Sequence, residues 1–210
     1  MRLYDTPRAP NPRRVRWFMA EKGIEDIEIV PVNLMQGAHR QPDYLAKAGV
    51  ANVPALEMDD GVCITESLAI CRYLESLYPE PNLFGRDARE IAVVEMWTRR
   101  AELLVATPMM LSVRHSFPPL AVLEQQNPAV AEYNHSSGTR ALKLFDRRLA
   151  ESEWIAGDRL TIADIVAFSG VDFCRMVKFE PAPELGALRR WMDAMRARPA
   201  AAAGMPPKKM

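Results

Sequence analysis

The amino-acid sequence predicts an α+β fold in which a small domain of βαβ-ββα order is followed by an all-helical domain. The first third of the 210-residue chain alternates short apolar runs with helical patterns, whereas everything after about Arg86 has helical periodicity. Between these parts, "YPEPNLFG" brings proline, asparagine and glycine together, as linkers do. We therefore expect domains over residues 1–78 and 87–210, joined by a linker over residues 79–86.

The elements of the first domain are expected in the following order. The strand "RLYD" precedes a helix from Pro12 to Lys22, which Gly23 ends. The next elements are the strand "IEIVPVNL", the short helix "QPDYLAKA", the strands "PALEM" and "VCIT" joined by a turn at residues 59–61, and a helix from Ser67 to Tyr78.

The second domain is predicted to contain about five helices, the longest near residues 87–115 and 128–150. One further helix begins within "TIADIVAF", residues 161–168. There Thr161 can cap the amide of Asp164 while the Asp164 carboxylate returns to the amide of Thr161. Because capping accounts for both residues, we assign this motif to folding.

Composition excludes several classes of function. Lys+Arg and Asp+Glu both number 27, so no global field favours nucleic acid or an acidic membrane. No apolar run approaches the length of a membrane helix, and we expect a cytoplasmic protein without a secretory leader. The three cysteines, Cys63, Cys71 and Cys174, lack C-x-x-C spacing, which argues against a disulfide framework or a metal site. We interpret them as small buried hydrophobic residues rather than nucleophiles.

The stretch "NVPAL", residues 52–56, places a proline at the start of an apparent central strand. If the bond from Val53 to Pro54 is cis, the amide and carbonyl of Val53 stay free to pair with an extended, peptide-like ligand. The alternative is an ordinary proline at a strand entry.

In "ITESLAICRYL", residues 64–74, Glu66 and Ser67 stand where a strand gives way to a helix. The amides of the first helical turn and the Ser67 hydroxyl can receive a carboxylate, and Glu66 can receive an ammonium group. An amino-acid head group would satisfy both. The alternative is plain helix capping by Ser67.

Together, "VPAL", "TES", "YPEPNLFG" and "WIAGDRLTIADI" resemble the cytosolic glutathione transferases over nearly the whole chain. The resemblance implies a thioredoxin-like first domain and a homodimer, with glutathione as co-substrate and no metal. It also implies Val53, Glu66 and Ser67 as glutathione ligands. The segment "GAHRQPDYL" is similar to the family segment whose histidine approaches the glycine carboxylate, which nominates His39, with Asn52 as its neighbour.

The loop after the first strand departs from the family pattern. Where catalytic members present a tyrosine, serine or cysteine to the glutathione thiol, this chain has Ala9. The pattern "PNPRRV" resembles the Nu-class bacterial transferases, of the Nu/theta-like group, and their fungal relatives. In these an asparagine near the helix start serves the thiol, which makes Asn11 the best candidate, followed by Thr6 and Tyr4. Alternatively, Asn11 is only the N-cap of a helix that begins at Pro12. Nearby arginines can lower the thiol pKa, and the candidates are Arg8, Arg13 and Arg14. Alternatively, Arg13, Arg14 and Arg16 form a solvated helix face.

A sheet domain followed by a helical domain leaves a cleft, where small-ligand pockets are common. We expect the pocket for the second substrate there, with walls from Arg8, Met109, Met110, Arg114, Phe117 and Phe173. The alternative for the methionine and aromatic residues is the core. The predicted function is a glutathione transferase that transfers the thiol to a small electrophile. A glutathione-dependent disulfide or peroxide reductase and a non-catalytic glutathione-binding protein are the alternatives.

Overall fold

The computed structural model describes residues 1–205 and divides into two compact units. Within the described residues, the first unit is Met1–Pro81 together with residues 202–205, and the second is Asn82–Ala201. The division falls inside the expected linker, whereas the return of the chain to the first unit at Ala202 had no sequence signal. The first unit contains β1 (Arg2–Asp5), α1 (Pro10–Lys22), β2 (Glu28–Pro31), α2 (Pro42–Ala48), β3 (Ala55–Glu57), β4 (Cys63–Thr65) and α3 (Ser67–Leu77), with short 3₁₀ turns at Leu34–Gln36 and Ala38–Arg40.

The sheet of the first unit has the order β2-β1-β3-β4. Strand β1 runs parallel to β2 and antiparallel to β3, and β3 runs antiparallel to β4. The register aligns Tyr4 with Ala55 and Ala55 with Thr65. As a result, the segments that follow β1, precede β3 and follow β4 all leave the sheet at one edge, which we call the site edge.

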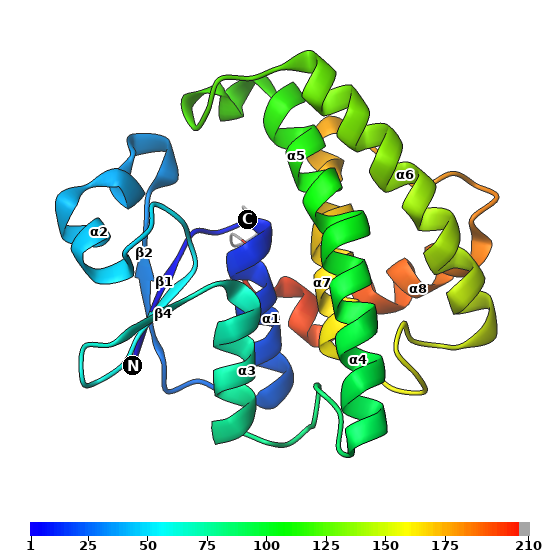
Figure 1. Cartoon of the computed structure of the whole chain (residues 1–210), viewed down its shortest axis with the longest axis horizontal. Coiled ribbons are helices and arrows are strands. Elements are labelled where there is room, and N and C mark those ends of the chain that lie inside the picture. Colours follow the sequence, from blue (N-terminus) through cyan, green and yellow to red (C-terminus); the bar gives the residue numbers. More distant parts are fainter. Residues whose placement is uncertain (206–210) are drawn as a thin grey trace. The chain divides into compact units, whose positions relative to one another are not determined.

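Helices cover both faces of this sheet (Figure 1). Helices α1 and α3 lie side by side, and they bury Val15 and Phe18 of the first and Ile70 and Leu74 of the second. On the other face, Tyr44 of α2 packs in a separate apolar cluster with Val32, Ala48 and Ala55. The helical periodicity of the sequence predicted these apolar faces correctly, because each helix has one face against the sheet.

Helix α3 begins at Ser67 as expected, but the start of α1 differs from expectation, and neither helix is capped as the alternatives in the sequence suggested. Helix α1 begins at Pro10, two residues early, and its N-cap is Ala9, which makes no side-chain capping bond. Asn11 therefore lies inside the first turn and is not the N-cap. Helix α3 has Glu66 as its N-cap, so Ser67 is its first residue and does not cap it. The expectation that Asn11 and Ser67 are helix caps is wrong at both positions.

The second unit is helical between residues 82 and 201. Its elements are α4 (Ala88–Arg100), a π-helical segment (Ala101–Ala106), α5 (Thr107–Ser116), α6 (Pro128–Glu151), α7 (Ile162–Phe173) and α8 (Gly186–Ala197), with 3₁₀ turns at Pro118–Val122, Cys174–Val177 and Pro199–Ala202. The first three follow one another without a break, so the long helix expected near residues 87–115 carries a π-helical centre. The helical periodicity and the second long helix are confirmed.

Helix α7 is buried from Ile162 to Asp172 and begins with the predicted capping box. The Asp164 carboxylate accepts from the amide of Thr161 at 3.0 Å and also from the amide of Ile155 and the indole of Trp191. Burial raises the pKa of Asp164, and these donors act against that rise. The motif is a folding element, as the sequence indicates.

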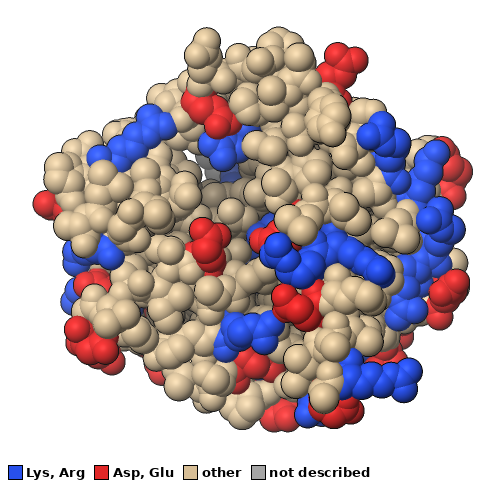
Figure 2. Space-filling view, in the orientation of Figure 1, with Lys and Arg blue, Asp and Glu red and all other residues tan. Residues whose placement is uncertain are grey.

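On the face shown in Figure 2, Lys and Arg side chains lie among Asp and Glu side chains, in keeping with the balanced composition. None of the helices within residues 1–205 is both long and apolar enough to span a membrane.

Candidate functional site

The site edge gathers the stretches that the sequence singles out in the first unit. The loop from Thr6 to Asn11 follows β1, Val53 and Pro54 precede β3, and Glu66 follows β4. Because Tyr4, Ala55 and Thr65 are aligned across the three strands, these segments start from neighbouring positions. Sequence order alone separates them by about 60 residues, so the sheet register is what brings them together.

The backbone at Val53 has unused hydrogen-bonding groups. The peptide bond from Val53 to Pro54 is cis, and neither the N–H nor the C=O of Val53 bonds to another residue of the described chain. The preceding residue, Asn52, is fixed because its carbonyl oxygen accepts a short hydrogen bond from the hydroxyl of Tyr44. Burial raises the pKa of Tyr44 to about 12, so that hydroxyl stays protonated and continues to donate.

The start of α3 offers groups of opposite character. Glu66 has a φ of 66°, a left-handed conformation that non-glycine residues rarely adopt, and its carboxylate is exposed. No described residue forms a hydrogen bond or ion pair with that carboxylate. Ser67 is only 4% exposed and begins the helix, where the amides of the first turn lack intrahelical acceptors. A cation can therefore bind at Glu66 and an anion at the helix start.

Arg14 reaches this helix start from α1. It is 2% exposed, and its Nη1 donates to Oγ of Ser67 at 3.3 Å. Its neighbour Arg13 is also buried, with its guanidinium 5.4 Å from the ring centre of Trp17. Arg16 donates to the buried carboxylate of Asp5. The interpretation of this run as a solvated helix face is therefore wrong, because the side chains pack within the first unit.

The three polar side chains considered for the thiol, those of Tyr4, Thr6 and Asn11, differ in whether they are already hydrogen-bonded. Tyr4 donates its hydroxyl to Glu57 at 2.7 Å, and Thr6 donates its hydroxyl to the carbonyl of Val32 at 2.5 Å. By contrast, Asn11 has its Oδ1 buried without a hydrogen-bond partner within residues 1–205. Ala9, at the position of the family's usual hydroxyl or thiol, has only a methyl group.

The two weaker candidates lie near the same edge in different environments. His39 alone would more often be a surface histidine, but it is buried in the 3₁₀ turn Ala38–Arg40. Asn52 has an exposed side chain and precedes the cis peptide bond. Because β2 is parallel to β1, the chain that follows β2 toward His39 also leaves from the site edge.

The proposed acceptor residues of the second unit divide into core and surface. Met109 is fully buried on α5, where its side chain would meet a Cβ placed on Gly138 at about 3.1 Å. Met109 therefore belongs to the core of its unit. Met110, Arg114 and Phe117 are partly exposed, as is Phe173, and Arg114 pairs with Glu124 at 2.8 Å. In the first unit, Arg8 is exposed and has a φ of 68°.

The cysteines have the properties of structural residues. All three are free. Burial raises the pKa of the Cys71 thiol and that of Cys174, the latter to about 12. Cys63 is partly exposed rather than buried as expected, and partial burial raises its pKa as well. None of these thiols has the low pKa of a nucleophile.

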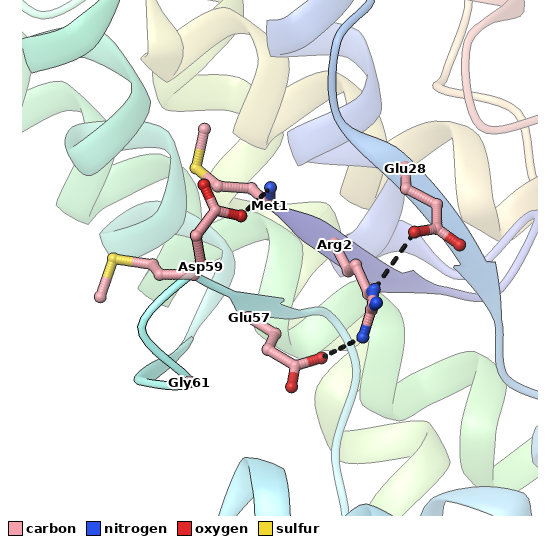
Figure 3. Close-up of a pocket in the computed structure, with 7 residues that line it drawn as sticks. Met1, Arg2, Glu28, Glu57, Asp59 and Gly61 are labelled. Atoms are coloured by element: carbon pink, nitrogen blue, oxygen red, sulfur yellow. Dashed lines mark hydrogen bonds and ion pairs between the residues drawn. The ribbon is translucent and has the colours of Figure 1, made fainter.

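A shallow cavity of about 330 Å³ lies at the opposite end of the sheet (Figure 3). Its charged groups neutralise one another: Arg2 bridges Glu28 and Glu57, and the N-terminal amine pairs with Asp59 at 2.7 Å. Since Arg2 is aligned with Glu57 at the far end of β1 and β3 from Ala55, this cavity is separate from the site edge.

Sequence reasoning named Arg14 only as a possible neighbour of the thiol and did not foresee its contact with Ser67, because nothing in a basic run marks one arginine as buried. It missed Tyr44, which is part of the short helix "QPDYLAKA" and has no motif of its own. The only sequence signal for Tyr44 is that it is an aromatic residue eight positions before Asn52, whose carbonyl oxygen it binds.

Comparison with known proteins gives a consistent result along the chain. A family model described as "Glutathione S-transferase, N-terminal domain" matches residues 3–82, and one described as "Glutathione S-transferase, C-terminal domain" matches residues 104–199. Glutathione S-transferase 2 of Saccharomyces cerevisiae is 37% identical over 202 residues, covering 95% of this chain and 87% of that protein.

Two solved structures are similar over almost their full length. A glutathione S-transferase domain-containing protein from Marinobacter aquaeolei VT8 superposes with a TM-score of 0.90 at 37% identity, covering 95% of this chain and 99% of that one. Gtt2 from Saccharomyces cerevisiae gives a TM-score of 0.90 at 36% identity, covering 95% and 98%. The predicted fold and family resemblance are confirmed, while the names of these relatives specify neither a Nu nor a theta class.

Proposed function

The chain belongs to the glutathione S-transferase family, and from this premise we propose that it binds glutathione at the site edge and activates the thiol for transfer to a small electrophile. The observation that carries the proposal is the free backbone of Val53 beside the cis bond to Pro54. The amide and carbonyl of one residue can pair with the cysteinyl unit of glutathione as an added strand would.

The start of α3 fits the γ-glutamyl end of the same molecule. That end has an ammonium and a carboxylate on one carbon. Glu66 has an exposed carboxylate that forms no hydrogen bond or ion pair with any described residue. Ser67 and the amides of the first helical turn offer donors at the positive end of the helix dipole. Two opposite charges on one head group thus meet two complementary partners.

Asn11 is the proposed partner of the glutathione sulfur. The alternative hydroxyls of Tyr4 and Thr6 already donate to protein acceptors. An amide N–H from Asn11 and the N-terminus of α1 would stabilise a thiolate and lower the thiol pKa. The thiol proton then leaves to solvent, and the sulfur electron pair forms the bond to the electrophile as its leaving group departs.

The remaining proposed contacts extend this arrangement. His39 and Asn52 are proposed for the glycine end of glutathione, which continues past Val53. Arg8, Met110, Arg114 and Phe117 are proposed for the second substrate, because their side chains are at least partly exposed. We no longer propose Met109, because it is fully buried.

A parallel assay tests the function. Purified protein is given glutathione with a chlorinated aromatic electrophile, an organic hydroperoxide or a small disulfide. Conjugation of the first is the expected result. Turnover of only the hydroperoxide or disulfide would replace conjugation with thiol redox chemistry. Binding of glutathione with no turnover of any substrate would identify a non-catalytic binding protein instead.

We also propose a homodimer in the cytoplasm. Met96 in α4 and Leu103 and Leu104 in the π-helical segment are exposed apolar side chains, and such surfaces often mark association sites. The free cysteines favour a reducing compartment. Light scattering measures the mass in solution, and a monomer at about 10 μM would contradict a stable dimer.

A further inference from the structure

The last described turn of the chain packs against the loop that leads to Asn11. Residues Ala202–Met205, which we call the clasp, belong to the first unit. The amide of Met205 donates to the carbonyl of Ala202 at 3.2 Å. Within this turn, the carbonyl of Gly204 accepts the amide of Arg8 at 2.9 Å. The clasp therefore contacts the loop after β1, which lies about 200 residues away in the sequence.

Arg8 occupies a backbone conformation that needs support. The amide of Ala9 donates to the carbonyl of Thr6 at 3.3 Å, which closes a four-residue turn with Pro7 in its second position. Arg8, in the third position, has a φ of 68°. A turn of this kind favours glycine there, because the left-handed region is unfavourable for other residues. The hydrogen bond from Arg8 to Gly204 supports the strained residue directly.

Gly204 is closely fitted to α1. It has a φ of +72°, and a Cβ at this position would lie 3.2 Å from Cα of Arg13 and 3.2 Å from Cβ of Arg16. A side chain at Gly204 would thus meet both an unfavourable backbone conformation and the surface of the helix. The clasp therefore holds two adjoining features, the turn at Arg8 and the first two turns of α1.

We propose that the clasp is a positioning element for the glutathione thiol, an inference that rests on the proposed function. The turn at Arg8 places Ala9, whose carbonyl accepts the amide of Arg13 at 3.0 Å and so starts α1. Asn11 lies in the helical turn between these two residues. By holding Arg8, the clasp fixes the positions of the first turn of α1 and of the Asn11 side-chain amide relative to the glutathione sulfur.

The hydrogen bonds and close approaches of the clasp are to Arg8 and α1, whereas Val53, Glu66 and Ser67 are proposed to bind the rest of glutathione. Loss of the clasp should therefore change thiol activation and leave glutathione affinity intact. For Gly204→Ala, we expect the pKa of the bound thiol to rise by about half a unit, so that the ratio of thiolate to thiol at a given pH falls about threefold. We expect kcat at neutral pH to fall by at most that factor, with the Kd of glutathione unchanged.

Gly61→Ala is the matched control. Gly61 also has a positive φ, +85°, and a Cβ there would meet nothing within 4 Å. It lies in the turn between β3 and β4, at the end of the sheet opposite the site edge. This variant therefore introduces the same kind of backbone strain without changing the loop after β1 that contains Arg8. We expect it to lower stability while the ultraviolet thiolate titration of bound glutathione stays as in the wild type.

Arg8→Gly provides a second, independent variant. Glycine tolerates the left-handed conformation, so the turn no longer depends on the clasp. In the Arg8→Gly background, both Gly204→Ala and a chain shortened after Ala201 should leave the bound-thiol pKa where Arg8→Gly alone puts it. This double-mutant comparison separates a specific link between the two residues from a general loss of stability.

The outcomes are distinct. The clasp is supported if Gly204→Ala shifts the pKa of the thiolate titration in the wild-type protein but not in the Arg8→Gly protein. The clasp is rejected, and the proposed function still stands, if Gly204→Ala leaves this pKa unchanged or shifts it equally in both proteins. Absence of any thiolate band on adding glutathione to the wild type rejects the proposed function itself, and the clasp with it.

Discussion

The guanidinium of Arg14 in α1 donates from Nη1 to the hydroxyl oxygen of Ser67 at the start of α3, at 3.3 Å. Both residues are buried and lie 53 positions apart in the chain. Because Ser67 accepts from Arg14, the hydroxyl proton of Ser67 is free to point toward a ligand carboxylate. The contact thus joins the helix that begins with Asn11 to the helix proposed to hold the γ-glutamyl group.

Removing the Arg14 guanidinium should weaken glutathione binding. Without the Arg14 donor, the Ser67 hydroxyl is no longer oriented to donate to a ligand carboxylate. Loss of one such hydrogen bond to a charged group, about 1.5 kcal/mol, corresponds to about a tenfold change in Kd. We therefore expect Arg14→Gln to raise the Kd of glutathione about tenfold in calorimetric titration. Arg14→Lys should recover part of the loss, because it retains the charge without the fork of donors.

Arg72→Gln is the control for this prediction. Arg72 is exposed on α3, so the substitution makes the same change of charge on the helix that carries Ser67. It should leave the Kd within about twofold, since exposed charges contribute little. An equal loss of affinity in the Arg72 and Arg14 variants would show that net charge, not the contact with Ser67, matters.

The contrast between Arg14 and the strands shows what the sequence can predict. The strands of the first unit and the apolar faces of α1 and α3 follow from periodicity, which is a local property of the chain. Arg14 belongs to a basic run without periodicity of its own. Its burial depends on α3, more than 50 residues away, so a local pattern contains no information about it.

The start of α1 could not be placed from sequence for a different reason. Both Pro10 and Pro12 are compatible with the first turn, where a missing N–H loses no helical hydrogen bond. The strong capping preference of asparagine favours a start after Asn11. In the structure the turn at Arg8 sets the boundary at Ala9 instead. Similarly, no residue preference predicts the left-handed conformation of Glu66.

Neutralising Glu66 should reduce glutathione affinity without reducing stability. Glu66→Gln keeps the shape of the side chain and removes the negative charge that would pair with the ligand ammonium. The carboxylate has no partner among the described residues, so the folded protein loses no contact. We expect a loss of about tenfold or more in affinity, measured as retention on immobilised glutathione and as Kd, with unfolding free energy unchanged within about 0.5 kcal/mol.

Glu25→Gln makes the same charge change in the exposed loop after α1, away from the site edge. It should be retained on immobilised glutathione like the wild type. Full retention of Glu66→Gln would place the ligand ammonium elsewhere. Combining Glu66→Ala with Ser67→Ala should abolish retention altogether.

Gly170→Ala should destabilise the second unit. A Cβ on Gly170 of α7 would lie 2.4 Å from Cα and 2.7 Å from Cβ of Ala106, the last residue of the π-helical segment. Backbone atoms cannot yield as a flexible side chain can, so the two helical segments must separate. We expect a loss of about 3 kcal/mol in unfolding free energy by urea denaturation.

Gly157→Ala is the control for overpacking, because a Cβ on Gly157 would meet nothing within 4 Å. This variant should unfold within about 0.5 kcal/mol of the wild type. If Gly170→Ala and the wild type have equal unfolding free energies, α7 and the π-helical segment can move apart without a measurable loss of stability.

The buried carboxylate of Asp5 should make stability fall as pH rises through mildly acidic values. Burial raises its pKa above the ordinary 3.8, and Arg16 only partly opposes this effect. Between the unfolded pKa and the raised folded pKa, the native state keeps a proton that the unfolded state has lost. Stability from this group is therefore greatest below pH 3.8, declines through that window and is constant above it.

Asp5→Asn removes this titration. We expect the difference in unfolding free energy between Asp5→Asn and the wild type to grow in favour of the variant as pH rises past 3.8 and to level off above the raised pKa of folded Asp5. Urea denaturation at several pH values measures this difference. A difference that instead shrinks as pH rises would mean that the pairing with Arg16 outweighs burial and that the folded pKa is lowered.

Asn11→Ala separates thiol activation from helix stability. Since Asn11 is not the N-cap of α1, its removal should not cause the loss of about 1 kcal/mol that is typical of a lost cap. Alanine also favours the helix and removes a buried oxygen that has no partner within the described residues. We therefore expect unfolding free energy equal to that of the wild type or slightly higher.

Unlike the stability of the protein, activation of the bound glutathione thiol should be impaired by Asn11→Ala. If Asn11 donates to the glutathione sulfur, Asn11→Ala should raise the bound-thiol pKa by about one unit, visible in the ultraviolet absorbance of the thiolate during a pH titration. Asn11→Ser should restore part of the shift, because its hydroxyl is also a donor. A titration that Asn11→Ala leaves unchanged would transfer thiol activation to the backbone amides at the start of α1, since Tyr4 and Thr6 already donate elsewhere.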